Sequence, residues 1–433
     1  MNNGYEKLPI SRIIPLGLQH VFAMFGATIL VPILTGLDPR TALFTSALGT
    51  ILFQIITRGR VPAYLGSSFA FIVPIQVAIA DYGLAAALFG CFTAGLVYVL
   101  LSVIIKNTGV GFIDKYFPPI VVGPVIMTIG LGLAPVARDM SNANIGVAMA
   151  TLAITIMVSQ FGKGLLKIIP ILMGVVGGYC ISLALHFAGI AELFDFTQLR
   201  EASWLPALPG YLAEIIRAPG TTVFNPANWH LGAVLIIAPV AAVTIIEHLG
   251  DVLTIGRTVG RDFVKDPGLN RTVLGDGIAT SVAALLGGPP NTTYGENVGV
   301  LAITKVFNPI VVQVAACFVL FFSLMPKVGA LIATIPVAVM GGVVVLLFGM
   351  IATVGIRTLV ERQVDFSETR NLVIASTIIV LGISGMKLFG LSGMGLGAIA
   401  GLILNIILPE THKDDRKQLP ALKYKDAPKY EKG

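Results

Sequence analysis

Four acidic residues between positions 247 and 296 are the side chains of this sequence best placed to do chemistry. Glu247, Asp251, Asp276 and Glu296 lie in stretches that are otherwise apolar. A carboxylate in apolar surroundings costs several kcal/mol unless it is protonated, paired or hydrogen-bonded. Glu247 and Asp251 are four residues apart in a helical pattern, so they share one helix face. Together the four predict a site for a polar ligand, for protons or for both.

Two segments rich in proline and glycine are expected to position these carboxylates. Residues 61–80 have Pro62 at their start and residues 289–306 begin with Pro289-Pro290, and each segment carries an early glycine, Gly66 and Gly295. Both patterns predict a short extended stretch that passes into a half-helix near the middle of a membrane. The N-termini of the half-helices would point backbone N–H groups at one spot. Such donors beside carboxylate acceptors suit a neutral ligand whose edge alternates N–H and C=O groups.

Composition and run length indicate a membrane protein. Of the 433 residues, 55% are hydrophobic and 12% are charged, and the mean hydropathy is +0.87. Soluble domains carry about 25% charged residues, so a soluble fold is excluded. Uncharged runs such as 13–37, 83–105, 168–190 and 231–246 approach or exceed the ~20 residues that cross a bilayer as a helix. The expected fold is an all-α polytopic membrane protein with about fourteen transmembrane segments.

The distribution of basic residues explains the net charge of +6 without a nucleic-acid partner. With fourteen segments, 23 of the 29 Lys and Arg residues fall on the side that holds both termini. Short cytoplasmic loops are rich in Lys and Arg, so both termini are expected in the cytoplasm. The expected location is a bacterial-type cytoplasmic (inner) membrane, which the chain crosses many times.

The sequence carries no signature of a metal site or of an enzyme. Cys91, Cys180 and Cys317 lie in apolar runs without the spacing of metal ligands, and we expect them to be small core residues. Neither a metal-ligand spacing nor a Ser/His pairing appears. No catalytic residue, metal or cofactor is therefore predicted.

An internal repeat organises the chain. His20 and His248 are 228 residues apart, and so are Pro62 and Pro290. The repeated order in each half is two spans, then a proline-led segment with tyrosine and glycine. Seven spans per half is an odd number, so the second half would enter the membrane in the opposite orientation. Inverted repeats of this kind are typical of transporters, and their broken segments point to the binding site.

Three short motifs resemble the nucleobase–ascorbate transporter family. They are the stretch Glu296–Gly299 followed by Thr304, the pair Gln19-His20 and the pair Glu247-His248. Longer stretches, such as "VPAYLGSSFAFIVP" and "NTTYGENVGVLAIT", resemble the bacterial uracil permeases of that family. The resemblance runs from about residue 10 to residue 408.

The resemblance implies two inverted repeats of seven segments, sorted into a core domain and a gate domain. It also implies short β-strands in broken segments 3 and 10, and a homodimer. The expected divisions are a cytoplasmic N-terminus (1–12), core (13–108), gate with an outer loop (109–230), core (231–328), gate (329–408) and a Lys-rich cytoplasmic tail (409–433).

The resemblance further implies a set of site residues. Glu247 and Glu296 would bond the ring of the substrate, and backbone N–H groups at Phe69 and Gly295 would meet its carbonyls. Phe69, Tyr294 and Ala27 would pack around the ring. Candidates for proton coupling or site organisation are Asp251, His20, Asp276, Gln19, Asn297 and Thr304. From the residues alone, Glu247 could instead pair with His20 or His248, and Asp251 and Asp276 could brace helix ends.

The function that these features favour is uptake of uracil with protons by alternating access, with membrane lipid as solvent. A second possible function is a purine carrier for xanthine or urate. Uracil permeases usually have a histidine at the position of Asp251, whereas an aspartate there is more typical of the purine carriers of the family. Glu296 favours uracil, since purine carriers usually have Gln there. An anion exchanger or channel of the same architecture is a weaker alternative, because four acidic groups give the site the wrong sign of charge.

Overall fold

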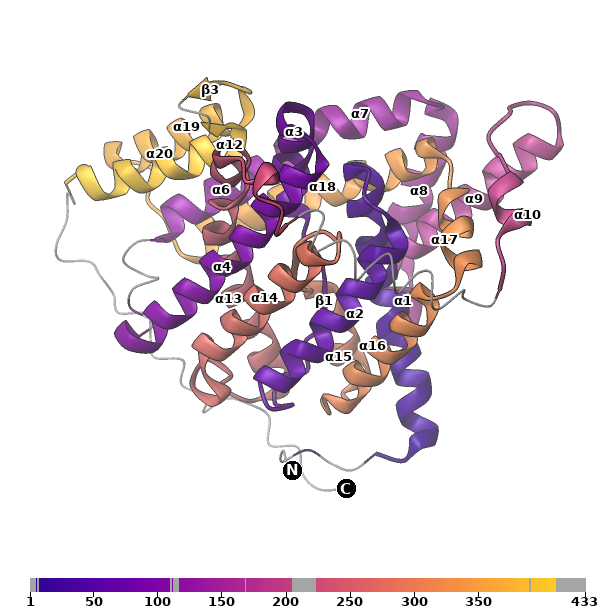
Figure 1. The fold of residues 1–433 in the computed structure, drawn as a ribbon, viewed down its shortest axis with the longest axis horizontal. Helices are drawn as coiled ribbons and strands as arrows, with labels where there is room; N and C mark the ends of the chain where they lie inside the picture. The colour runs from indigo at the N-terminus through magenta and orange to yellow at the C-terminus, as the bar shows by residue number, and fades with distance from the viewer. Residues whose placement is uncertain are drawn as a thin grey trace.

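The computed structural model describes residues 5, 8–109, 111, 117–167, 169–204, 223–388 and 391–409. Of the predicted tail 409–433 only Pro409 is described, and residues 1–4, 6 and 7 of the N-terminal segment also lie outside the described residues. Helices dominate the rest (Figure 1).

In the first half of the chain, proline and glycine set most element boundaries. Pro39 opens α2, which Asp38 caps by accepting hydrogen bonds from the N–H groups of Arg40 and Thr41. The elements are α1 (Ile10–Thr35), α2 (Pro39–Ile56), β1 (Leu65–Ser67), η1 (Phe69–Phe71), α3 (Ile72–Tyr82), α4 (Leu84–Thr108), α6 (Pro119–Gly132), α7 (Ala134–Asn142), α8 (Ile145–Phe161), η2 (Gly164–Lys167), α9 (Pro170–Phe187) and α10 (Thr197–Glu201).

In the second half of the chain, glycine and proline again lie at helix ends. Gly260 ends α13 in the left-handed region, with φ of 76°, which suits a residue without Cβ. The elements are η3 (Pro226–Asn228), α12 (Leu231–Ile237), α13 (Val240–Val259), η4 (Val264–Gly268), α14 (Leu269–Leu285), β2 (Asn291–Thr293), α15 (Gly295–Thr304), α16 (Ile310–Ser323), α17 (Pro326–Ala333), α18 (Val337–Glu361), α19 (Thr369–Ile383), β3 (Lys387–Leu388), β4 (Leu391–Ser392) and α20 (Gly393–Ile407).

Several helices are long and apolar enough to cross a membrane. Within the described residues there are six such helices, or up to seven if α16 and α17, which bend by 82°, form one broken span. The prediction of a mostly helical, multi-pass membrane protein is confirmed. Other predicted spans form shorter apolar helices, such as α8 and α19. The division into fourteen segments and the inverted repeat stay predictions.

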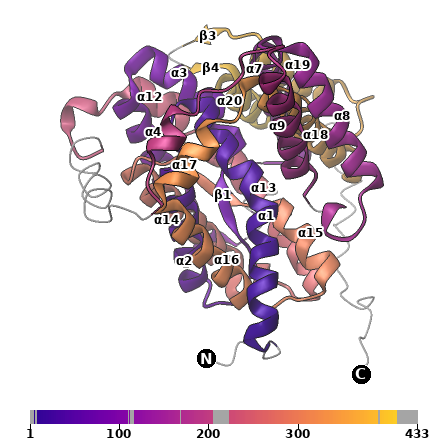
Figure 2. The same cartoon turned by 90° about the vertical axis from the view of Figure 1, so that its right-hand side faces the viewer.

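The two segments that are rich in proline and glycine meet in the interior. Each contains one three-residue strand, and β1 pairs with β2 in antiparallel register, Leu65 opposite Thr293 and Ser67 opposite Asn291. All six strand residues are buried, and Figure 2 shows β1 enclosed by helices. Because the strands satisfy each other's backbone groups, extended chain is tolerated where no water reaches it.

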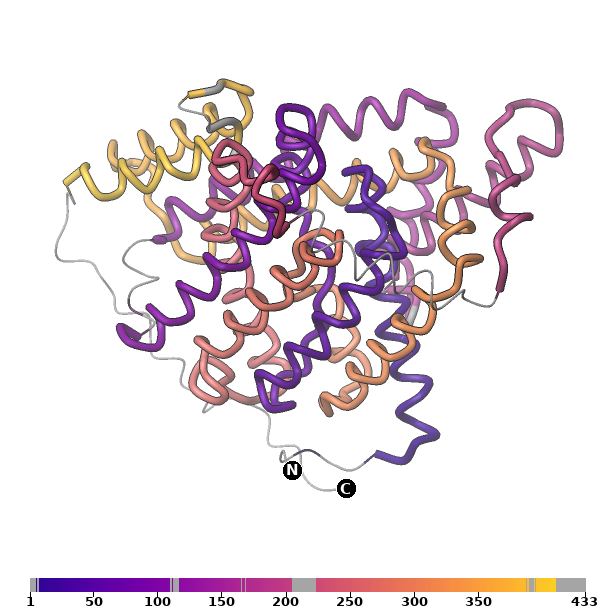
Figure 3. The backbone as a smooth tube through the Cα atoms, in the orientation of Figure 1, coloured from indigo at the N-terminus to yellow at the C-terminus, as the bar shows by residue number. Residues whose placement is uncertain are grey.

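Helices from the two halves pack against one another. α14 of the second half packs on α2 and α4 of the first, and α18 packs on α6, α7 and α8. Early and late segments, such as α1 and α16, therefore lie side by side (Figure 3). At Gly277 on α14 a side chain would collide with Tyr98 on α4, so this pair needs glycine to approach closely. The boundaries of the core and gate domains stay a prediction.

The prediction for the cysteines is wrong at two positions. Cys91 is buried, but Cys180 and Cys317 are exposed on the chain. The physical reason is that lipid is as apolar as a protein core, so a small apolar residue on a membrane helix can face either.

Candidate functional site

Three of the predicted carboxylates meet at the start of α15. Glu247 and Asp251 lie on α13, and Glu296 lies in the first turn of α15. One carboxylate oxygen of Asp251, Oδ1, lies 3.3 Å from the place that a Cβ on Gly295 would occupy. Asp251 is close enough to interact electrostatically with Glu247, Glu296 and Asp276. The structure thus brings the four predicted acidic residues together.

The four carboxylates differ in how far solvent reaches them. Glu247 and Gly295 are exposed, Asp251 and Glu296 are half-buried, and Asp276 is fully buried. A ligand can therefore contact Glu247 and the start of α15 directly. Asp276 lies behind this surface, out of contact with solvent.

The exposed face of α13 continues away from the carboxylates. Gly250 and Thr254 are exposed and Thr258 is half-buried, at the helical spacing that follows Glu247. The Thr254 hydroxyl donates to the Gly250 carbonyl, and the Thr258 hydroxyl donates to the Thr254 carbonyl. A polar stripe thus runs from Glu247 to the C-terminal end of α13.

The N-terminus of α15 offers backbone donors. Tyr294 is extended, with φ of −103° and ψ of 119°, and its side chain does not cap the helix that starts at Gly295. Orphan N–H groups and the positive end of the helix dipole favour electron-rich oxygens here. In the first broken segment, the 3₁₀ turn η1 at Phe69 precedes the half-helix α3.

Predicted ring-packing residues form one wall beside this start. Tyr294 and Ala27 are buried in the same hydrophobic cluster, and half-buried Phe69 packs against it. The Tyr294 hydroxyl donates to the Ser67 carbonyl at 2.8 Å, and its ring lies directly over Gly66. Tyr294 is therefore fixed by β1 before any ligand arrives.

His20 and Asn297 tie α1 to α15. The Asn297 side-chain nitrogen Nδ2 donates to His20 Nδ1 at 3.0 Å and to the His20 carbonyl at 3.2 Å. Both residues are buried, and neighbouring Gln19 is half-buried. This geometry makes His20 and Asn297 organisers of the fold around the site.

Thr304 is not brought to the site. Its hydroxyl donates to the Val300 carbonyl at 2.8 Å and accepts from the Val306 N–H, at the C-terminal end of α15. At about 1.5 Å per residue, it lies about 12 Å along the helix from Glu296. In the structure Thr304 closes the helix end.

His248, which the sequence reasoning did not select, lies beside Asp276. Its Nδ1 is 2.9 Å from Asp276 Oδ2 and 2.9 Å from the Thr293 hydroxyl. The alternative in which Glu247 pairs with His20 or His248 is wrong, since these histidines contact Asn297 and Asp276 instead. The sequence signal for His248 was that a buried carboxylate needs a partner. Which carboxylate His248 contacts depends on how α13 and α14 pack, and the sequence does not show this.

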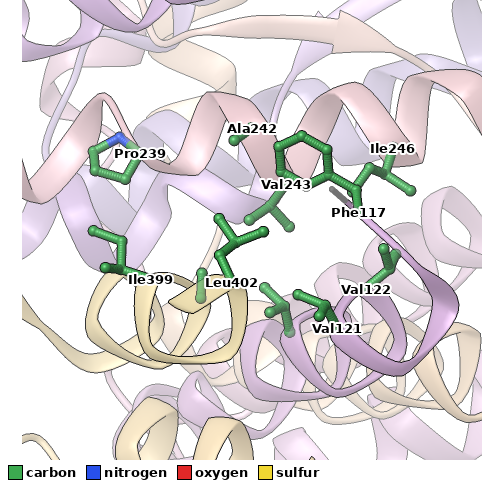
Figure 4. A pocket seen from close by; sticks show the side chains of 11 residues that line it. Phe117, Val121, Val122, Pro239, Ala242, Val243, Ile246, Ile399 and Leu402 are labelled. Atoms are coloured by element: carbon green, nitrogen blue, oxygen red, sulfur yellow. The ribbon is translucent and has the colours of Figure 1, made fainter. Parts of the chain in front are cut away.

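Two cavities lie outside the carboxylate cluster. One of about 80 Å³ lies between α6, α13 and α20 and has only apolar walls, with Val122, Ile246 and Leu402 among them (Figure 4). The other, of about 360 Å³, is lined by Arg60, Arg261 and the segment 262–266 at the ends of α2 and α13. Neither contains a predicted site residue. Among the described residues no group of three or more His, Cys, Asp or Glu could hold a metal ion.

Comparison with protein-family models decides the family. The xanthine/uracil permease model, described as the Permease family, matches residues 11–391. The chain belongs to the nucleobase–ascorbate transporter family. Of the signature residues of this nucleobase–ascorbate transporter family member, Glu247 and Glu296 lie at the start of α15, whereas Thr304 lies at the other end of that helix.

Curated relatives cover almost the whole of this nucleobase–ascorbate transporter. The uracil permease of Bacillus caldolyticus is 49% identical over 418 residues, 93% of this chain and 94% of the relative. That of Bacillus subtilis (strain 168) is 46% identical and covers 96% of this chain and 97% of its own length. That of Escherichia coli (strain K12) is 41% identical, covering 88% and 87%.

Solved structures share the fold of the nucleobase–ascorbate transporter at low identity. The transmembrane domain of the cyanobacterial bicarbonate transporter BicA has a TM-score of 0.61 at 18% identity and covers 91% of this chain and 96% of its own. The murine anion transporter Slc26a9 in its inward-facing state has a TM-score of 0.67 at 12% identity, covering 93% and 69%. At these identities the likeness concerns the fold alone.

Proposed function

We propose that this chain takes up uracil together with protons across the cytoplasmic membrane by alternating access. The observation that carries the proposal is the meeting of Glu247 and Glu296 with the uncapped start of α15 on a surface that a ligand can reach. Uracil permeases at 41–49% identity over most of the chain support the choice of substrate.

The chemistry of uracil suits these groups. Its ring edge alternates N–H donors and C=O acceptors. Carboxyl oxygens of Glu247 and Glu296 accept from ring N–H groups, while the backbone N–H groups at Gly295 and Phe69 donate to the carbonyls. Tyr294, held by the Ser67 carbonyl, offers a rigid wall for the ring.

Proton coupling is proposed through Glu247, with Asp251 as the second carrier. Three carboxylates that repel one another are costly to bring into a closed site, so a proton that enters with the substrate removes part of that cost. Loading of both would let the core domain move against the gate domain, and release follows when the proton leaves to the cytoplasm.

Xanthine is the second candidate substrate. Asp251 lies beside Gly295 in the structure and interacts with Glu247, so it stands where it can add an acceptor for a further ring N–H. An anion is disfavoured, because four carboxylates at the site repel it. We also propose a homodimer, which the family resemblance supports. Both termini are proposed to lie in the cytoplasm, which the distribution of basic residues supports.

Calorimetry on the purified protein tests the substrate. Tight uracil binding with little xanthine binding, stronger at about pH 6 than at about pH 8, is the expected result, because the proton and substrate load together. Preference for xanthine would assign the protein to the purine carriers.

The variant Glu247→Gln tests the coupling. Because its amide cannot exchange a proton with the substrate site, uracil accumulation against a gradient in vesicles should be lost. Accumulation by this variant at the parent level would rule out Glu247 as the proton carrier.

A further inference from the structure

A buried chain of hydrogen bonds runs behind the candidate site. Asp276 on α14 and His248 on α13 are both fully buried, with Nδ1 and Oδ2 2.9 Å apart. The Thr293 N–H donates to the same Oδ2 at 3.3 Å. The Thr293 hydroxyl lies 2.9 Å from His248 Nδ1. The chain therefore joins α13, α14 and the end of β2.

The protonation of His248 follows from its contacts. An ionised carboxylate only accepts hydrogen bonds, so the contact with Asp276 Oδ2 requires a proton on Nδ1 or between the two groups. In the described part of the chain, the other titratable groups that act on this pair are acidic or phenolic. They are Glu247, Asp251 and Tyr98, each of which interacts electrostatically with Asp276. Phe53 covers the imidazole with the edge of its ring, at 6.4 Å between centroids.

Thr293 transmits this arrangement to the ligand surface. It is the last residue of β2, and Tyr294 and Gly295 follow it directly. A shift of Thr293 would move both the Tyr294 ring and the N–H of Gly295. Since a displacement of about 1 Å can cost about a hundredfold in a functional site, small movements here have large effects.

We propose that His248 is a positioning residue of transport. Its Nδ1 proton holds Asp276 and Thr293 together, which fixes the start of α15 and separates Asp276 from the carboxylates that exchange protons with substrate. The inference rests on the proposed function, which leaves His248 without a role.

Three variants test whether His248 acts through its hydrogen bond or only by filling space. In His248→Asn the amide nitrogen stands as many bonds from Cα as Nδ1 does, so the donor is kept. His248→Ala removes this donor and leaves the Asp276 carboxylate with the Thr293 N–H as its remaining described donor. We expect uracil affinity to fall at least about tenfold in His248→Ala, and by no more than about threefold in His248→Asn. His248→Ala/Asp276→Asn removes the carboxylate charge as well.

The pH dependence of thermal stability gives a readout without ligand. A buried carboxylate that has lost its imidazole partner is more costly to ionise, so the stability of His248→Ala should fall more steeply than that of the parent as pH rises from about 5 to about 8. The double variant should lose this extra slope. Equal slopes for His248→Ala and the parent, or equal loss of affinity in His248→Ala and His248→Asn, would overturn the proposal.

The stability readout keeps the two proposals apart. If the parent binds no uracil, the proposed function fails, while the pH slopes still decide the role of His248. If the parent binds uracil and the slopes do not differ, only the positioning role fails.

Discussion

At the scale of single residues, acidic side chains in apolar runs predicted which residues the structure brings together at the candidate site. Glu247, Asp251 and Glu296 converge because each needs polar surroundings, and the start of α15 supplies them. The sequence could not tell that Asp276 is buried behind the site, since exposure depends on which helix face packs against α4 and α2. For the same reason its partner His248 was missed.

Glu296→Gln tests the residue that separates uracil from purines. An ionised carboxylate only accepts hydrogen bonds, whereas an amide also donates. When the NH₂ group of the glutamine side chain points at the ring, it faces an N–H of uracil, and two donors meet. Uracil affinity should fall about tenfold or more, and the ratio of xanthine to uracil affinity should rise. Calorimetry measures both.

Glu361→Gln is the matched control, because within the described ranges the ion pair of Glu361 is with Arg357, on an exposed helix face. It should bind uracil as the parent does. A Glu296→Gln protein with unchanged preference would remove this position from ligand recognition.

At the scale of elements, prolines and glycines predicted where the two broken segments begin, but not how they pair. The register of β1 and β2 follows from contacts that lie more than two hundred residues apart in sequence, such as the Tyr294 ring over Gly66. A pattern along one segment carries no information on its partner, so register and ring contact came only from the structure.

Gly66→Ala tests this contact. A Cβ at residue 66 would overlap the Tyr294 ring, which would have to leave its place beside the Ser67 carbonyl. The expected results are a fall in uracil affinity of about tenfold or more and a lower melting temperature. Gly132→Ala on α6 is the control, since a Cβ there meets nothing within 4 Å. Equal behaviour of the two variants would contradict the role given to Gly66.

At the scale of the whole molecule, hydropathy predicted a many-helix membrane protein but did not fix its spans. Run length alone cannot distinguish a long helix such as α18 from two short ones joined at a bend, as in α16 and α17. The packing of first-half helices on second-half helices could not be predicted either, because similar apolar faces fit many partners.

The direction of access is testable with cysteine. Thr254→Cys, in a background with Cys180 and Cys317 replaced by Ser, places a thiol on the exposed polar stripe of α13. Because that stripe leads to the end expected in the cytoplasm, a membrane-impermeant thiol reagent should label it in inside-out vesicles and not in right-side-out vesicles. Thr272→Cys, fully buried on α14, should stay unlabelled. Labelling of Thr254→Cys from the outside alone would reverse the proposed orientation.

The antiparallel pair of strands has a consequence for biosynthesis. Leu65 precedes Asn291 by 226 residues (291 − 65), so at about 5–20 residues per second the ribosome makes β1 roughly 11–45 s before β2. For that time the backbone groups of β1 lack their final partner in a setting where water cannot replace it. Until β2 is made, the insertion machinery or the helices of the first half must therefore shield the backbone of β1 from lipid. The strand pair forms only after the second half has been synthesised.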